Sequence, residues 1–389
     1  NLVDETDGGL RRMAFGLDWE DRQQEKLLDR NARLLDLLTL AYRSTGRRSY
    51  RDQAVATATF LTSRLSVDGG AFGSAVCEWC PGGRDEVVLS GPNGLAAAAL
   101  IRAGAVFGEE ELLKRGFQAA RFLREHRYRP GRLVPRAVVD GLAQPPGNFV
   151  LDDQVMVAGA FVTAFEASGD PAWRDAAVDL VSTTVVNMRS PGVGALPDII
   201  PQRKAPPPLR FGLFPQSTNS QMVRVLVRLF YLTDDRSFRN AARDILKAYG
   251  GSYRTSGLQL PAYGIAAYEY HFPPMTANVV AAPAAAGADG LRHAAMGSPF
   301  PFVIVRTWLT DREAETIRGL GFALAADAGI YVFQAGLGSA RQTGPAGVAA
   351  VMNDIRTRVV ERSDDERAGA DENDEGTSTR RKLRRGGDR

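Results

Sequence analysis

The sequence has little of several residue types on which specialised sites depend. Its 389 residues include only two cysteines and three histidines, and aromatic residues make up 8%. So few thiols and imidazoles argue against a zinc site, and we expect no metal and no cofactor. Uninterrupted apolar runs, such as residues 95–101, fall far short of the roughly 20 residues that cross a bilayer. We therefore expect no transmembrane span.

Neither sign of charge is in excess. Lys and Arg number 48 against 45 Asp and Glu, a formal net charge of +3. A balance this even is not the footprint of a nucleic-acid-binding protein, so nucleic acid is not an expected partner. The hydrophobic content of 44% is that of a globular protein with a sizeable core. The chain begins at Asn1 without a charged and apolar leader, from which we expect a processed or partial form, and its localisation is left open.

What the sequence does contain is a repeated unit of helix, turn and helix. Four turns of small or polar residues, each followed by an aromatic residue or leucine, recur at spacings of 62, 61 and 65 residues, counted from Gly46 to Gly108, Gly169 and Asp234. Each unit is too small to bury its own apolar face, so neighbouring hairpins must stack and share a core. The period predicts a mainly α fold, an array of antiparallel helical hairpins.

Apolar residues at helical spacing locate the paired helices. Seven leucines fill one broad face of the first, residues 25–43. Long Gly- and Pro-rich loops separate the hairpins, and loops of this length often carry binding groups. The expected helices are residues 25–43 and 49–65, 93–107 and 110–126, 152–167 and 171–188, and 219–232 and 237–249.

The pattern changes after Pro274, and we divide the chain into three parts. Residues 1–275 are the helical domain. Residues 276–361 are expected to form a small α/β appendage, with strands around Val303 and Ile330 and helices at 311–320 and 345–360, whereas residues 281–288 are expected to be weakly structured. Residues 362–389, an acidic stretch followed by a basic cluster, are expected to be a disordered tail. The basic cluster is either solubilising or an anchor for nucleic acid or acidic lipid.

Several segments near the helix starts resemble a known family. They read Asn-Gly-Leu-Ala at 93–96, Leu-Asp-Asp-Gln at 151–154, Phe-Glu-Ala-Ser-Gly-Asp-Pro at 165–171 and Ser-Thr-Asn-Ser at 217–220. In order and spacing they are similar to the helical part of the thioredoxin-domain proteins that include the spermatogenesis-associated thioredoxin-like proteins. That part in turn resembles the toroids of N-acylglucosamine 2-epimerases and six-hairpin glycosidases. The resemblance covers roughly residues 7–272 and implies an (α/α)6 toroid with carbohydrate-active relatives.

Two departures limit what the resemblance implies. The family's thioredoxin domain and earliest toroid helices would precede Asp7, so we expect a ring that is incomplete at its N-terminus unless another chain or segment closes it. Where the family carries histidine, this chain has Arg11 and Gln23. Arginine stays protonated and glutamine does not titrate, so neither can act as a general base.

Asn31, Asn93 and Asn219, together with Asp152 and Asp153, lie in or near the starts of the first helices of successive hairpins. Stacking would bring them to one rim of a central cavity. There the asparagines would bind a ligand and the two aspartates would act as acid and base. The alternative is that they cap their helices. Adjacent aspartates also cannot face the same way on a helix, which weakens the catalytic interpretation.

Cys77 and Cys80 are the only cysteine pair, and their spacing suits a disulfide, a redox pair or half of a metal site. A redox motif normally opens a helix after a strand, whereas this pair lies in a glycine-rich loop. We therefore favour a structural disulfide or two idle thiols. His271 lies in an aromatic cluster that is either a stacking platform for a sugar or simply part of the core.

Three hypotheses for function remain. We favour a non-catalytic scaffold or interaction subunit derived from a sugar-active toroid, with protein partners in a larger assembly. The second is a carbohydrate-active enzyme, a sugar epimerase or isomerase or a glycoside hydrolase, which acts on a sugar ligand through Asp152 or Asp153. The third is thiol redox chemistry at Cys77 and Cys80. The cavity would separate the first two hypotheses. A cavity ringed by ionisable groups would favour the enzyme, and one filled by apolar side chains would favour the scaffold.

Overall fold

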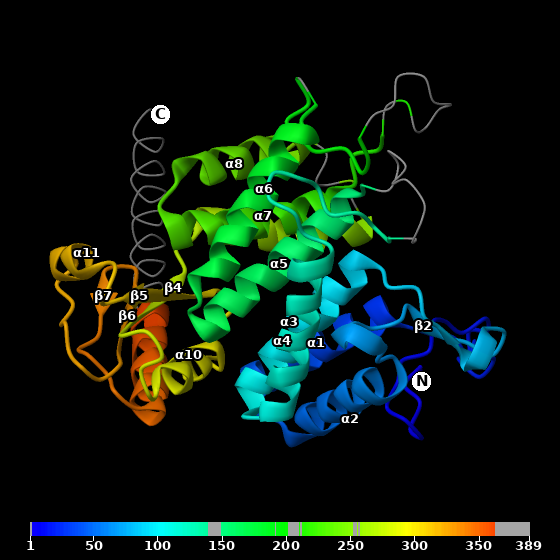
Figure 1. Cartoon of the computed structure of the whole chain (residues 1–389), viewed down its shortest axis with the longest axis horizontal. Coiled ribbons are helices and arrows are strands. Elements are labelled where there is room, and N and C mark those ends of the chain that lie inside the picture. The colour runs from blue at the N-terminus through cyan, green and yellow to red at the C-terminus, as the bar shows by residue number, and fades with distance from the viewer. Residues whose placement is uncertain are drawn as a thin grey trace, which may run out of the picture.

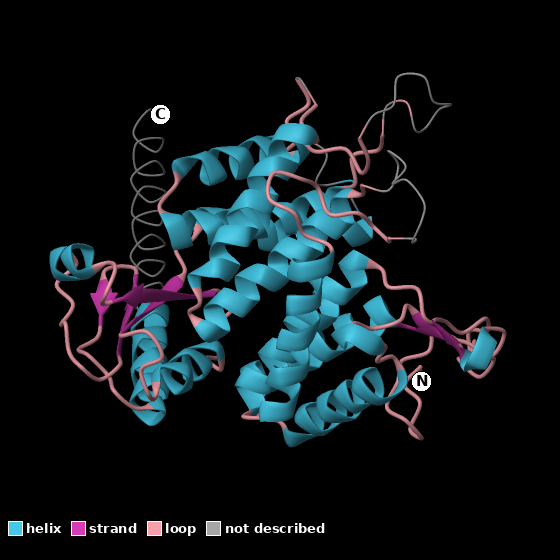
Figure 2. Cartoon of the chain, viewed as in Figure 1, coloured by secondary structure: helices cyan, strands magenta, loops and turns pink. Residues whose placement is uncertain are grey.

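The computed structural model describes residues 2–138, 149–190, 192–200, 210, 212–251, 255 and 257–361. Helical hairpins make up the body of the molecule, and a small sheet lies at each of two opposite ends (Figure 1, Figure 2). The tail predicted for residues 362–389 lies outside the described residues.

Four hairpins follow one another in the predicted order. The first helices of successive hairpins contact each other in a series that ends on a further helix, α9, and they form an inner layer (Figure 1). The second helices form the outer layer. The predicted mainly α array of stacked hairpins is therefore confirmed. The pairs are α1 (Leu28–Thr45) with α2 (Arg48–Arg64), α3 (Ser90–Phe107) with α4 (Glu110–His126), α5 (Leu151–Ser168) with α6 (Pro171–Asn187), and α7 (Gln216–Thr233) with α8 (Arg236–Tyr249), and α9 spans Leu260–His271.

The repeated turn has a simple structural cause. Each inner helix of the four hairpins ends on a residue in the left-handed region, with φ between 60° and 71°. Three of these residues are glycines, which adopt that conformation without a steric penalty, and the fourth is Asp234. The next residue, Asp235, accepts a hydrogen bond from the backbone N–H of Ser237 at 2.8 Å and so caps α8. In all four hairpins the chain thus reverses within two residues.

The hydrophobic core lies between the two helical layers. Leu28 and Leu35 of α1 are fully buried, whereas Leu37 of the same helix is 61% exposed, so the leucine-rich face divides between core and surface. Inner helices α3 and α5 approach closely at Gly94. A Cβ there would lie 2.7 Å from the carbonyl oxygen of Met156, so no larger residue fits without a shift of the backbone.

The predicted α/β appendage is present, with elements that the sequence did not reveal. Its sheet has the order β5-β4-β6-β7, in which β4 and β5 are parallel and the other pairs antiparallel. Residues 281–288, expected to be weakly structured, join β4 to α10, and neither of those elements was predicted. The elements are β4 (Met275–Ala281), α10 (Ala288–Met296), β5 (Val303–Leu309), α11 (Ala314–Gly319), β6 (Gly329–Gln334), β7 (Leu337–Gly338) and a last helix at residues 345–361.

This sheet lies at the C-terminal ends of the inner helices (Figure 1). Met275 and Ile304 belong to the same hydrophobic cluster as Leu28 and Phe161, so the core runs on from the helices into the appendage. The loops at the opposite ends of the inner helices form a second, three-stranded antiparallel sheet. Its strands are β1 (Lys26–Leu27), β2 (Ala75–Val76) and β3 (Arg84–Asp85).

Candidate functional site

Four inner helices carry an amide side chain at the same place, their fourth residue. In α3, the side-chain oxygen of Asn93 accepts a hydrogen bond from the backbone N–H of Phe72 at 2.8 Å. Its nitrogen donates to the carbonyl of the same residue at 2.9 Å, and also to the carbonyl of Leu89. The other inner helices repeat this arrangement. The four amides and their loop partners are Asn31 with Leu10, Asn93 with Phe72, Gln154 with Val134, and Asn219 with Leu196.

These amides fasten the long loops to the inner helices. All four are 0% exposed, and loop backbone occupies both ends of each amide. Asn31, Asn93 and Asn219 therefore do not form the ligand-binding rim predicted for them, because their polar atoms are enclosed and already bonded. They are not helix caps either, since these helices begin three residues earlier and have no side-chain cap. The equivalent residue of α5 is Gln154, not one of the aspartates.

Asp152 and Asp153 lie in the first turn of α5 and have different surroundings. Asp152 accepts a hydrogen bond from the hydroxyl of Thr218 on α7. Asp153 is 1% exposed, accepts a hydrogen bond from the backbone N–H of Gly91 at 2.8 Å and lies 3.5 Å from the guanidinium of Arg136. Burial raises the pKa of Asp153 to about 6, against the lowering influence of Arg136. Nothing in the sequence around Asp153 indicated this buried environment.

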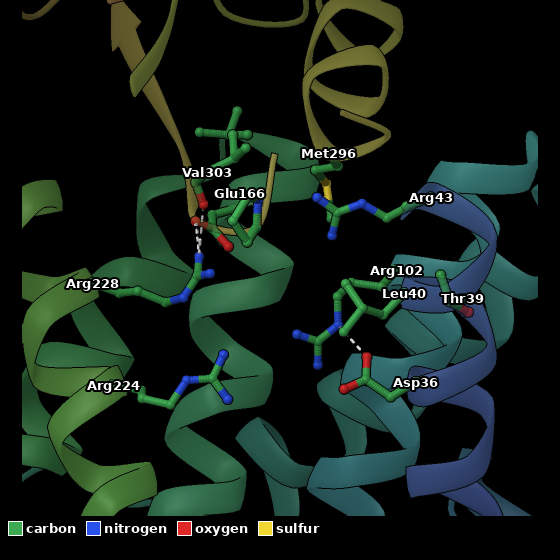
Figure 3. A pocket seen from close by; sticks show the side chains of 12 residues that line it. Asp36, Thr39, Leu40, Arg43, Arg102, Glu166, Arg224, Arg228, Met296 and Val303 are labelled. Carbon is green, nitrogen blue, oxygen red and sulfur yellow. Dashed lines mark hydrogen bonds and ion pairs between the residues drawn. The ribbon is translucent and has the colours of Figure 1, made fainter. Parts of the chain in front are cut away.

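A cavity of about 110 Å³ lies at the other end of the inner helices, beneath the sheet (Figure 3). Four arginines dominate its wall, from α1, α3 and α7, together with the carboxylates of Asp36 and Glu166. Aliphatic side chains and Met296 supply the rest of the wall, with Thr39, and none of these residues is aromatic. The arginines are Arg43, Arg102, Arg224 and Arg228.

Two of the arginines bind the C-terminal appendage to the helices. Arg43 donates to the carbonyl of Ser298 from Nε and Nη2, at 3.0 and 2.6 Å. Burial lowers the pKa of Arg43 to about 10, so it stays protonated at neutral pH. Arg228 donates from Nη1 both to Glu166, at 2.8 Å, and to the carbonyl of Val303, at 3.1 Å. Burial raises the pKa of Glu166, and the positive charge of Arg228 opposes that rise.

The other two arginines use only part of their guanidinium groups. Nε of Arg102 lies 2.9 Å from a carboxylate oxygen of Asp36. Arg224 donates from Nε and Nη2 to Glu269, at 3.0 and 2.8 Å. Desolvation would lower the pKa of Arg224, but the charges of Glu269 and Asp36 outweigh it and raise that pKa. Figure 3 shows the guanidinium groups of Arg102, Arg224 and Arg228 pointing into the cavity.

The predicted catalytic pair is remote from this cavity. Asp152 and Asp153 lie in the first turn of α5, whereas Glu166 lies in its last turn. At a rise of 1.5 Å per residue, about 20 Å of helix separates them. The aspartates and the arginines therefore cannot act on one small ligand.

The remaining predicted site residues also lie outside the cavity wall. His271 ends α9, is exposed and meets Tyr270 edge to face, with ring centroids 5.0 Å apart. Its neighbours Tyr268 and Phe272 stack at 4.9 Å and are exposed, whereas Tyr270 packs against the hydrophobic core, so only part of the aromatic cluster belongs to the core. Cys77 and Cys80 form a disulfide beside the second sheet.

Sequence reasoning missed the arginines. Arg224 and Arg228 are four residues apart and so share a face of α7, and Arg102 interrupts a nearly apolar α3. A charged residue on an otherwise apolar inner helix was the available signal. Among the described residues, no three His, Cys, Asp or Glu side chains are grouped so that they could hold a metal ion. None of the described helices combines the length and apolar character needed to span a bilayer.

Comparison of the sequence with family models and with curated proteins finds no match. Solved structures do match in fold. A cellobiose 2-epimerase from Spirochaeta thermophila superposes with a TM-score of 0.54 at 19% identity, over 66% of each chain. A D-mannose isomerase gives 0.54 at 16%, over 64% of this chain and 66% of its own. A family 76 α-mannanase from Bacteroides thetaiotaomicron gives 0.52 at 12%, over 75% and 80%. The fold is thus that of the (α/α)6 toroids, and this chain spans about two thirds of the epimerase and isomerase.

Proposed function

We propose that this chain is a non-catalytic protein built on the toroid of sugar-active enzymes, a scaffold or interaction subunit of a larger assembly. A cavity ringed by ionisable groups would by itself favour the enzyme. The observation that carries the proposal is the kind of groups present: arginines dominate the wall, and both carboxylates are paired to them. Proton transfer at a sugar carbon needs a group that titrates near neutrality, and histidine does so with least perturbation. None of the three histidines, all described, contributes to this wall.

The carboxylates of the wall are poorly placed to replace histidine. The Glu166 side chain is 8% exposed, and one of its oxygens accepts from Arg228, so it serves the protein rather than a substrate. Asp36 is paired to Arg102. Arg11, where the resembled family has histidine, lies 2.7 Å from Asp4 in a largely enclosed ion pair. These three ion pairs support a structural role for charged side chains that an enzyme would use for acid–base catalysis.

Two measurements test this proposal. The isolated chain should show no turnover of cellobiose, mannose or α-1,6-mannan, and the native particle should have a mass well above the 42.1 kDa of the chain. Robust turnover that is lost in Asp152→Asn or Asp153→Asn, with the fold intact by circular dichroism, would make the protein an enzyme. A native particle no heavier than one chain would contradict the scaffold role in a larger assembly.

A glycoside hydrolase is the second candidate, favoured by one observation. Two adjacent carboxylates have different environments. Asp153 is buried, which raises its pKa to about 6, whereas Asp152 accepts from the hydroxyl of Thr218. A pair of carboxylates in different environments is the pattern of an acid and a base. One structural neighbour is an α-1,6-mannanase variant described as inactive, in which two consecutive aspartates are replaced by alanine. In this reading Asp153 is the acid and Asp152 the base, at the end of the ring opposite the arginines.

We also retain the relation to the thioredoxin-domain proteins as a proposal, which rests on the segments around the hairpin starts. This proposed relation does not include thiol redox chemistry at Cys77 and Cys80. The disulfide of Cys77 and Cys80 closes a loop of a few residues beside β2 and β3, where it serves as a local staple. A double serine variant should keep the fold and the native assembly, and a thiol-exchange activity lost in that variant would contradict this role.

A further inference from the structure

We propose that the arginine cavity binds a small oxyanion, a carboxylate or phosphate group on a molecule of sugar size or smaller. This inference goes beyond the scaffold proposed above and does not depend on it, because binding requires neither turnover nor a partner chain. It rests on unpaired donors, on the balance of charge and on the absence of aromatic side chains from the wall.

The first step is the count of donors. A guanidinium group has five N–H donors. Nε of Arg102 lies 2.9 Å from a carboxylate oxygen of Asp36 but makes no hydrogen bond, and both Nη atoms are without a protein partner among the described residues. Arg224 uses Nε and Nη2, and Arg228 uses Nη1, so each keeps further donors. Figure 3 shows all three groups directed into one space. A carboxylate or phosphate presents pairs of oxygen acceptors that such forks bind.

The second step is the balance of charge. Four arginines line the cavity, but only three carboxylates among the described residues pair with them: Asp36, Glu166 and Glu269. Guanidinium groups held this close repel one another, and the repulsion is stronger near buried, low-dielectric surroundings than in water. An oxyanion would offset that repulsion and occupy the free donors together.

The third step concerns the kind of molecule that carries the anion. Sugars are commonly held by stacking on aromatic rings, but the described wall has none. Leu40, Met296 and Val303 provide only a small apolar surface. A neutral sugar would therefore gain little here, and the charged group must supply most of the affinity.

The cavity is also accessible. The side chains of Asp36 and Arg224 are 47% and 41% exposed, whereas that of Arg228, beneath the sheet, is 21% exposed. A solute can thus enter between α1 and α7, meet Arg102 and Arg224 first and reach Arg228 behind them. Entry past Asp36 opposes an anion, so this residue should weaken binding.

The test is calorimetric titration of the full chain with inorganic phosphate, glucose 6-phosphate, glucuronate and glucose. We expect the anions to bind and glucose not to bind. The two sugar anions distinguish phosphate from carboxylate, and free phosphate shows whether a sugar is needed at all.

Arg102→Gln should weaken anion binding by about 10-fold or more, the effect of one lost charge-assisted hydrogen bond. Asp36→Asn should strengthen it, because it removes a repelling charge from the entrance of the cavity.

A matched control separates the site from net charge. Arg243 is exposed and pairs with the neighbouring Asp244, so Arg243→Gln removes the same charge from the surface. Affinity unchanged by Arg243→Gln but reduced by Arg102→Gln, in variants with the wild-type melting temperature, supports the site. Absence of anion binding at millimolar concentration, equal binding of glucose, or equal weakening by both variants overturns it. None of these outcomes bears on turnover or on particle mass, so the two proposals fail separately.

Discussion

Arg228 on α7 and Glu166 on α5 form an ion pair of 2.8 Å across the inner layer, and the same guanidinium nitrogen reaches the carbonyl of Val303 on β5. One side chain thereby joins two inner helices and the appended sheet. Both partners are largely enclosed, with side-chain exposures of 21% and 8%. A pair of this kind contributes less through attraction than it would cost if one partner were removed.

Arg228→Met should therefore destabilise the protein by about 3–5 kcal/mol, because it leaves Glu166 buried without its counter-charge. Chemical denaturation measures this loss. The double variant Arg228→Met with Glu166→Gln should recover most of it. Arg243→Met, at an exposed pair, should cost no more than about 1 kcal/mol. Equal losses in Arg228→Met and Arg243→Met would show that the inner pair is not buried as described.

The carboxyl of Asp153 should make stability depend on pH in an unusual direction. Its pKa is raised by burial to about 6, above the value near 3.9 of an unfolded aspartate. The folded state thus binds more protons between about pH 4 and 6, and stability falls as pH rises through that window. The contribution lost by pH 7 is on the order of 3 kcal/mol.

Asp153→Asn removes this titration while an amide oxygen can still accept from Gly91. Its unfolding free energy should therefore vary less than that of the wild type from pH 4 to 7, and should exceed it at pH 7. Asp175→Asn, at an exposed surface pair, serves as the control. If the Asp153→Asn profile runs parallel to the wild type, Asp153 does not titrate in this range.

Asn93→Ala should release the loop before α3. It leaves the buried N–H and carbonyl of Phe72 without partners, at a cost of about 2–5 kcal/mol. Limited proteolysis should then cleave within residues 66–89 faster than in the wild type. Asn187→Ala, on the exposed end of α6, should change stability by no more than about 0.5 kcal/mol. Unchanged protease resistance in Asn93→Ala would mean that the amide does not hold the loop.

Two leucines on one helix test the division of α1 between core and surface. Leu35→Ala should cost about 2–5 kcal/mol, because this side chain is fully buried. Leu37→Ala should be nearly neutral, since Leu37 is 61% exposed. Thermal unfolding of the two variants measures both. Similar melting temperatures would indicate that residue 37 is covered in solution, as it would be if a partner packed on this face.

The hairpins were predictable because their signals are local. The residue in the left-handed conformation at each turn, such as Gly46 or Asp234, recurs at a fixed period, and the apolar spacing of helices such as α1 needs no information from distant residues. Strand β4 was not predicted. Thr276, Val279 and Val280 favour a strand, but the alanines and the asparagine of Met275–Ala281 do not, and pairing with β5 and β6 on both sides decides the outcome.

The sequence by itself determined the repeating hairpins, and with them the inner and outer layers of the toroid. It also placed Asn31, Asn93 and Asn219 at one end of the array, but not the direction of their side chains, which depends on loops that return about 20 residues away. Only the tertiary structure brought Arg102, Arg224 and Arg228 into one cavity beneath β5. Arg102 is far from Arg224 and Arg228 in the chain, and a helical pattern identifies a charged face without showing which other helix that face meets.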